Sequence, residues 1–115
     1  MRYIWVWLML LPIIAHASED DYNRAWCAEH GGQAEVVLAD RTRADCVTAT
    51  HAVETDYAPK WAESIGQALY YAFQTNKRAG IVLIVDPADN GRYLYRLNSV
   101  IEHNGLAIDV ETVKR

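Results

Sequence analysis

The sequence has little of what marks several familiar functional classes. It holds only two cysteines, and no closely spaced set of cysteines and histidines of the kind that binds zinc. It has no glycine-rich loop for holding nucleotide phosphates, and no run of basic residues that would line a nucleic-acid groove. These absences argue against a zinc-binding module, a P-loop enzyme and a protein that binds nucleic acid tightly.

Long apolar runs are also scarce, and the one that exists lies at the start of the chain. Arg2 precedes the apolar residues 3–14, and Ala-His-Ala at 15–17 fits a small-x-small cleavage site. The run is short for a membrane span. We predict a signal peptide over residues 1–17, cleavage after Ala17, and export to the periplasm or extracellular space. The mature chain would then have no transmembrane span; an uncleaved amphipathic anchor is the alternative.

The mature chain is expected to be residues 18–115, a length that suits one small domain. Without Arg2 it carries ten Lys and Arg residues against fifteen Asp and Glu residues, a formal charge of −5. A surface that binds phosphates is normally positive. Nucleic acid is therefore a partner only if a local basic patch exists, and the sequence names no protein partner.

Both cysteines, Cys27 and Cys46, lie in the predicted mature chain. In an oxidising compartment two such cysteines are expected to form a disulfide. The bond would close a loop of about twenty residues and contribute roughly 3 kcal/mol in the chain-entropy model. Because a paired cysteine is not a nucleophile, the pairing argues against cysteine catalysis.

Apolar periodicity and turn residues predict three helices and five strands. In the clearest helix Trp61, Ile65 and Leu69 recur at helical spacing. The predicted helices span 19–30, 60–77 and 92–103, and the predicted strands span 33–39, 43–49, 51–58, 79–86 and 106–113. The strand at 79–86 is nearly all apolar, so both of its faces should be covered. The order α-β-β-β-α-β-α-β predicts an α/β fold with a mixed sheet flanked by helices.

Three carboxylates are candidate metal ligands. Residues two apart on a strand point to the same face, so Glu54 and Asp56 should share one face of the strand at 51–58. Asp45, on the preceding strand, joins them if the hairpin register allows. Carboxylate oxygens suit hard cations such as Mg²⁺ or Mn²⁺, and three acids crowded without a cation would repel one another. A metal site and a solvent-exposed acidic face are the two interpretations.

This order of elements and these acids resemble the restriction-endonuclease-like fold of the PD-(D/E)xK nucleases. Asp45, followed by Glu54 on the next strand, resembles the acidic part of their signature, and Gln67-x-x-x-Tyr71 resembles the motif of the RecB-type branch. The resemblance implies a metal-dependent nuclease site that Gln67 and Tyr71 order or through which they contact the substrate backbone. It also implies an acidic residue from the first helix, for which Glu29 is the candidate.

The chain departs from that signature at one position. The pattern calls for Glu-x-Lys, in which the lysine positions or activates the attacking water, whereas this chain has Glu54-Thr55-Asp56. Some members of the superfamily carry the lysine on a neighbouring element, and Lys60 is the candidate here. On a helix, positions 60, 64, 67 and 71 fall on one stripe. Lys60 would then share an edge with the Q-x-x-x-Y motif; a solvated lysine in the first turn is the alternative.

The predicted disulfide bears on the role of Glu29. Cys46 points away from Asp45 on its strand, and Cys27 and Glu29 point in roughly opposite directions on their helix. A bond between the cysteines would draw the helix to the sheet face opposite Asp45. Glu29 would then join the acidic cluster only by reaching around an edge.

Two functional hypotheses follow. The first is an exported nuclease or phosphodiesterase in which Asp45, Glu54 and Asp56 bind Mg²⁺ or Mn²⁺ and Asp45, Glu54 and Lys60 carry the catalysis. The second is a non-catalytic binding or interaction module of the cell envelope on the same fold. The grouped acids and the Q-x-x-x-Y pattern favour the first hypothesis. The acidic charge, the small size and the missing Glu-x-Lys lysine argue against it, and a fold does not fix a function.

Overall fold

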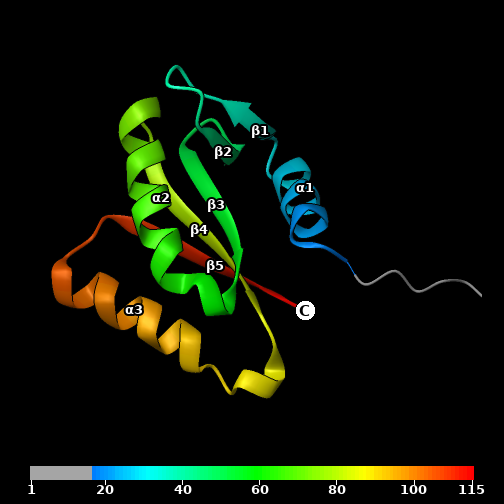
Figure 1. Ribbon diagram of the computed structural model, residues 1–115, viewed down its shortest axis with the longest axis vertical. Coiled ribbons are helices and arrows are strands. Elements are labelled where there is room, and N and C mark those ends of the chain that lie inside the picture. Colours follow the sequence, from blue (N-terminus) through cyan, green and yellow to red (C-terminus); the bar gives the residue numbers. More distant parts are fainter. Residues whose placement is uncertain (1–16) are drawn as a thin grey trace, which may run out of the picture.

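The computed structural model describes residues 17–115, and the predicted signal peptide lies outside the described residues except for its last residue, Ala17. The elements follow the order that the sequence predicts (Figure 1). The helices are α1 (Glu19–Glu29), α2 (Trp61–Thr75) and α3 (Arg92–Asn104). The strands are β1 (Gln33–Val37), β2 (Arg43–Val47), β3 (His51–Tyr57), β4 (Arg78–Val85) and β5 (Ile108–Lys114). Short 3-10 turns, η1 (Ala58–Lys60) and η2 (Pro87–Asp89), precede α2 and α3.

The strands form one mixed sheet in the order β1-β2-β3-β4-β5. The first three strands are antiparallel, and β3, β4 and β5 are parallel to one another. Parallel neighbours need a crossover connection, which α2 and α3 supply. Figure 1 shows these two helices together, with α1 standing apart from them beside β1 and β2. The prediction of an α/β fold with a helix-flanked mixed sheet is confirmed.

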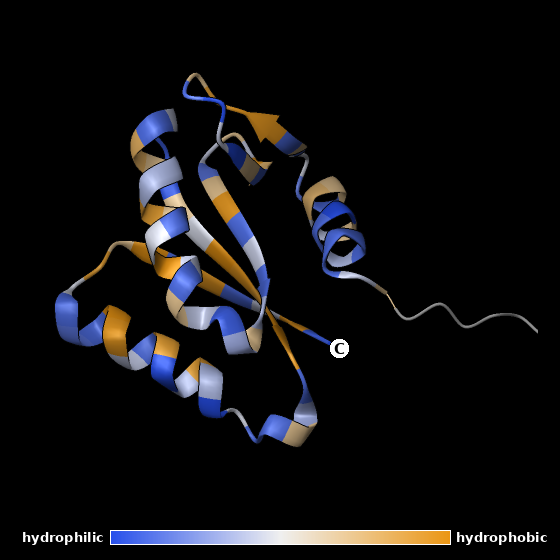
Figure 2. Ribbon diagram, viewed as in Figure 1, coloured by the Kyte–Doolittle hydropathy of each residue, from blue (hydrophilic) through white to orange (hydrophobic). Residues whose placement is uncertain are grey.

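One face of the sheet packs against α2 and α3. Ile81 and Leu83 of β4 point to this face and are almost completely buried against Leu97 of α3. Trp61 and Ile65 of α2 pack on the same cluster, as their helical spacing predicts. Figure 2 shows the matching alternation of hydrophobic and hydrophilic residues along both helices. This cluster is the larger part of the core.

The other face of the sheet packs against α1 through the predicted disulfide. Cys27 of α1 is bonded to Cys46 of β2 with a Cα–Cα distance of 5.8 Å, which confirms the pairing. The two sulfurs pack with Val53 and with Val82 of β4. Val82 points opposite to its neighbours in β4, so this strand is buried on both faces as predicted.

Local signals set the ends of α1. Ser18 and Asp21 form a capping box, in which the Ser18 hydroxyl accepts from the Asp21 N–H at 3.1 Å and Asp21 Oδ2 accepts from the Ser18 N–H at 2.9 Å. The helix ends before Gly31, whose φ of 66° is left-handed. At Gly32 a Cβ would lie only 2.6 Å from Cys46 Sγ and 2.8 Å from Cys27 Sγ. A side chain at position 32 would therefore collide with the disulfide.

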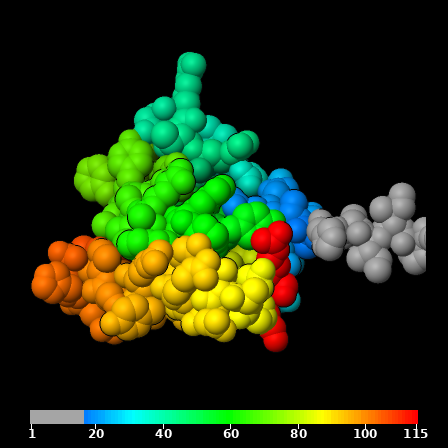
Figure 3. Space-filling model, turned by 60° about the horizontal axis from the view of Figure 1, so that its bottom comes forward, coloured from blue at the N-terminus to red at the C-terminus, as the bar shows by residue number. Residues whose placement is uncertain are grey.

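The remaining boundaries lie within about two residues of the sequence-based ones, as is usual for element ends. The strand β5, for example, begins at Ile108 rather than 106, although Leu106 still packs on the core. Figure 3 shows α3 and the connection from β4 lying across one end of the molecule, beside the C-terminal residues. No helix within residues 17–115 is long and apolar enough to cross a membrane.

Candidate functional site

The site begins where β2 and β3 separate. Their backbone ladder pairs Cys46 with Val53 and Val47 with Ala52. At the next position, around Asp45 and Glu54, backbone N–H groups bond to side chains instead of to the opposite backbone. The Asp45 N–H donates to Glu54 Oε1 at 3.3 Å, and the Thr55 N–H donates to Asp45 Oδ2 at 2.8 Å. Two carboxylates thus face each other in the gap between two strands.

Asn23 of α1 ties the two strands together across this gap. Its side-chain amide donates to the Asp45 carbonyl oxygen at 2.7 Å, and its amide oxygen accepts from the Thr55 hydroxyl at 2.8 Å. Asn23 is only 2% exposed, so both of its bonds are shielded from water. The buried amide therefore sets the spacing at which Asp45 and Glu54 meet.

Six of the residues singled out in the sequence line one polar cavity of about 670 Å³. They come from β2, β3, η1 and α2 and comprise Asp45, Glu54, Asp56, Lys60, Gln67 and Tyr71. The parallel crossover places α2 over β3, which is how a strand and the following helix come to share the cavity. The grouping that the sequence suggested is therefore present in the structure.

Burial controls the charge of the acids. Glu54 is 4% exposed, and its burial, together with the negative charge of Asp45, raises its pKa to about 9. Burial also raises the pKa of Asp45. The two carboxyl groups are therefore expected to share a proton at neutral pH.

Asp56 lies further along the same face of β3 and has a different environment. It is 6% exposed, and burial raises its pKa to about 6, while a hydrogen bond from the Ser64 hydroxyl at 2.6 Å opposes the rise. Ser64 of α2 is completely buried. Asp56 therefore changes its charge within the range of pH in which an exposed aspartate is always ionised.

Lys60 lies at the mouth of the cavity rather than on the α2 stripe, because it belongs to η1. Its ammonium is 3.4 Å from Glu19 Oε2, and the nearby Glu19 charge raises its pKa. The side chain is 52% exposed. Lys60 is thus neither turned away into solvent nor in direct contact with Asp45 or Glu54.

The acidic residues that α1 brings to the cavity are Glu19 and Asp20, not Glu29. Glu19 lines the cavity, whereas Glu29 lies exposed at the far end of the helix. Positions 19, 23 and 27 are four residues apart and so share one helical stripe. Once Cys27 is bonded to the sheet, Glu19 and Asn23 must face the sheet too. This orientation of α1 could have been predicted from the positions of the cysteines.

The other cations around the cavity are also paired. Arg24 lies 2.8 Å from Asp20, and Arg43 lies 2.9 Å from Glu35. With Lys60 these are the only lysines and arginines of residues 17–115 that line the cavity. The cavity is therefore acidic overall, with each positive side chain held by an acid at the rim.

Within the described part of the chain, no three His, Cys, Asp or Glu side chains lie close enough to hold a metal ion together. The Asp45–Glu54 pair remains, and Mg²⁺ is commonly held by one or two carboxylates, with water and substrate phosphates completing its coordination. The oxygen donors present suit a hard cation of this type. The residues present therefore fit a metal site with two carboxylate ligands.

Comparison with models of known protein families, with curated proteins and with solved structures finds no match to this chain. The case for a function rests on the residues of the cavity.

Proposed function

We propose that this protein is an exported phosphodiesterase or nuclease dependent on Mg²⁺ or Mn²⁺, with a restriction-endonuclease-like fold of the Q-x-x-x-Y type. The observation that carries the proposal is the buried Asp45–Glu54 pair, held in the gap between β2 and β3 by Asn23. The Cys27–Cys46 disulfide is consistent with export, and the periplasm or extracellular space is the compartment that we propose.

Asp45 and Glu54 are the residues that would hold the cation. Its charge would replace the proton that the buried pair shares, which removes the like-charge repulsion between the two carboxylates. A divalent cation in this position would stabilise the negative charge that develops on a phosphoryl oxygen. The donor set is the reason for preferring Mg²⁺ or Mn²⁺ over softer metals.

The other residues divide the remaining tasks. Asp56, which the sequence offers as a third ligand, has a pKa of about 6 and so suits a proton acceptor near neutral pH. Ser64 fixes its orientation. Lys60 would leave Glu19 to neutralise a substrate phosphate at the mouth of the cavity. Gln67 and Tyr71 would form the wall against which the substrate backbone rests.

The test is a hydrolysis assay with bis(p-nitrophenyl) phosphate and with labelled single-stranded and duplex DNA. The oxidised wild-type protein is compared with the variants Glu54→Gln and Lys60→Ala, each with Mg²⁺, Mn²⁺ or EDTA. Glu102→Gln, an exposed position on α3, is the matched control. Metal-dependent hydrolysis that Glu54→Gln abolishes and Glu102→Gln leaves intact supports the proposal. Hydrolysis that survives Glu54→Gln, or that EDTA does not affect, contradicts it.

The second candidate is a non-catalytic envelope module that binds a cation or a protein through the same cavity. The pairing of Lys60, Arg24 and Arg43 with acids favours it, because no lysine or arginine lining the cavity is left over to hold a phosphate. Cation binding that Glu54→Gln removes, in a protein that hydrolyses none of the three substrates, would select this candidate.

A further inference from the structure

A second cavity lies on the other face of the sheet and is independent of the proposed hydrolytic site. It has a volume of about 430 Å³, within the range of small-molecule sites. Its lining includes Trp26 from the last turn of α1, His30 at the C-cap of that helix, Val53 and Gly80 from the sheet, and Asp109 and Glu111 from β5. The cavity therefore combines an apolar base with two carboxylates on one strand.

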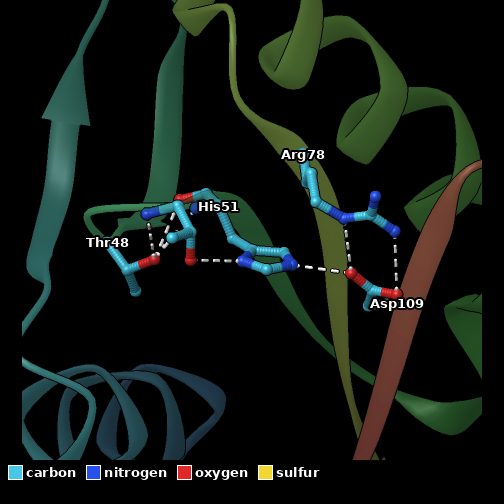
Figure 4. Close-up of polar contacts among 5 residues, drawn as sticks. Thr48, His51, Arg78 and Asp109 are labelled. Carbon is cyan, nitrogen blue, oxygen red and sulfur yellow. Dashed lines mark hydrogen bonds and ion pairs between the residues drawn. The ribbon is translucent and has the colours of Figure 1, made fainter.

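The two carboxylates are not equivalent. Figure 4 shows Asp109 held between His51 and Arg78, with Thr48 on the other side of His51, next to its backbone. His51 Nε2 lies 2.7 Å from Asp109 Oδ2, and Arg78 donates from Nε at 3.0 Å and from Nη2 at 3.3 Å. Both oxygens of Asp109 already have hydrogen-bond partners within the protein. This carboxylate therefore lines the cavity but is not available to a ligand.

Glu111 keeps one oxygen free. Its Oε2 accepts from Trp26 Nε1 at 2.7 Å and lies 3.7 Å from His30 Nε2. Its Oε1 accepts no hydrogen bond from the residues that the structure describes, and the side chain is 58% exposed. A carboxylate oxygen without a partner, at the edge of a cavity, is an acceptor for a charged donor on a ligand.

Trp26 and His30 form an aromatic wall of the cavity next to Glu111. Trp26 and His30 stack with their ring centroids 3.8 Å apart and their planes 13° apart. The hydrogen bond to Glu111 fixes the indole ring. The indole therefore presents a fixed, flat aromatic surface to the cavity. Gly80, which has no side chain, lines the base of the cavity, and a Cβ there would lie 3.1 Å from Val53 Cγ2.

We infer that this cavity is a binding site for a small planar organic cation, such as an amidinium or an aromatic ammonium compound. The free oxygen of Glu111 pairs with the cationic nitrogen, and Trp26 contributes aromatic surface, which attracts cations as well as flat apolar groups. Arg78 neutralises Asp109, so Glu111 supplies the charge that selects a cation over a neutral molecule of the same shape.

The test uses three ligands of nearly identical shape: benzamidine, benzamide and benzoate, which are positive, neutral and negative. Binding is followed by NMR through the indole N–H signal of Trp26, with the signal of Trp61 on α2 as the internal reference. Benzamidine is expected to shift the Trp26 signal saturably with a Kd of roughly millimolar order, as befits so small a ligand. Benzamide should bind about tenfold more weakly and benzoate not at all, because a charge-assisted hydrogen bond is lost.

The variant Glu111→Gln tests the named carboxylate. Glutamine keeps an oxygen that accepts from Trp26 Nε1 but removes the charge, so benzamidine should bind it no better than benzamide binds the wild-type protein. Glu102→Gln should leave binding unchanged. Equal binding of benzamidine and benzamide to the wild type overturns the inference without reference to any variant. So does an absence of binding, or binding that shifts the signals of Asp45 and Glu54 instead of Trp26.

Discussion

The charge of Glu54 makes the stability of the folded protein depend on pH. The pKa of this carboxyl rises from an ordinary value of 4.5 to about 9 in the folded protein, mainly through burial. Between these two values the folded chain holds a proton that the unfolded chain releases. The free energy of unfolding must then fall as the pH rises, by up to about 1.4 kcal/mol per pH unit for one proton.

Without metal, raising the pH from about 6 to about 8 should therefore cost the wild-type protein about 2 to 3 kcal/mol. For a chain of this size that corresponds to a fall in Tm on the order of 10 °C. Burial also raises the pKa of Asp45, so its contribution has the same sign. Thermal and urea unfolding in EDTA, followed by circular dichroism, measure both quantities.

Glu54→Gln should remove most of this dependence. A glutamine has the shape of the protonated acid: its oxygen can accept from the Asp45 N–H, and its amide can donate to the Asp45 carboxylate. The variant should match the wild type at low pH and be more stable by about 2 kcal/mol near pH 8. Glu102→Gln should keep the wild-type profile. If the profiles of Glu54→Gln and wild type run parallel over this range, the reasoning about the buried pair is refuted.

Three further predictions concern the parts that hold the site. Asn23→Ala leaves the Asp45 carbonyl and the Thr55 hydroxyl without partners, and urea unfolding should show a loss of about 2 to 4 kcal/mol, against less than about 0.5 for the surface control Asn104→Ala. Replacing both cysteines by alanine should cost roughly 3 kcal/mol; a stability that neither this change nor a reductant alters would contradict the structural role of the bond. Gly32→Ala should destabilise the oxidised protein by about 1 to 3 kcal/mol and be tolerated better in the cysteine-free background, since its Cβ would meet the two sulfurs; a cycle of unfolding measurements with equal costs in both backgrounds would exclude that contact as the cause.

The sequence predicts the fold because its signals are local. Helical spacing in residues 60–77, the apolar strand at 79–86 and the glycines at 31 and 32 each act within a few residues, and together they give the correct order of elements. The disulfide follows from the number of cysteines and the predicted compartment. These features need no knowledge of tertiary contacts.

The site is predicted less completely because it depends on how α1 docks. The acids on β2 and β3 follow from strand periodicity, but the choice between Glu29 and Glu19 depends on which side of α1 faces the sheet. The cysteine bond decides that, and it places Glu19 and Asn23 on the sheet side. Asn23 and Ser64 carry no sequence signal of their own, since an asparagine or serine in a helix is ordinarily a surface residue.

The contact made by Lys60 could not be predicted from the sequence, for a different reason. Its position after Asp56 is visible in the sequence, but the direction of its long side chain is set by a partner on α1, 41 residues away. Neither strand nor helix periodicity in the sequence can predict such a contact. Lysine side chains have many rotamers, so an ion pair at the cavity mouth holds Lys60 only weakly. That weak hold is what the proposed move towards a substrate phosphate requires.

The most direct test of the central claim is a titration with Mn²⁺, in which electron paramagnetic resonance counts the ion that stays free. The wild-type protein, Glu54→Gln, Asp45→Asn and Glu102→Gln are compared near pH 8. The Asp45–Glu54 pair predicts one Mn²⁺ bound by the wild type and by Glu102→Gln, and none bound by either site variant at the same concentration. Binding that survives both site substitutions, or a wild-type protein that binds no Mn²⁺, would contradict the account.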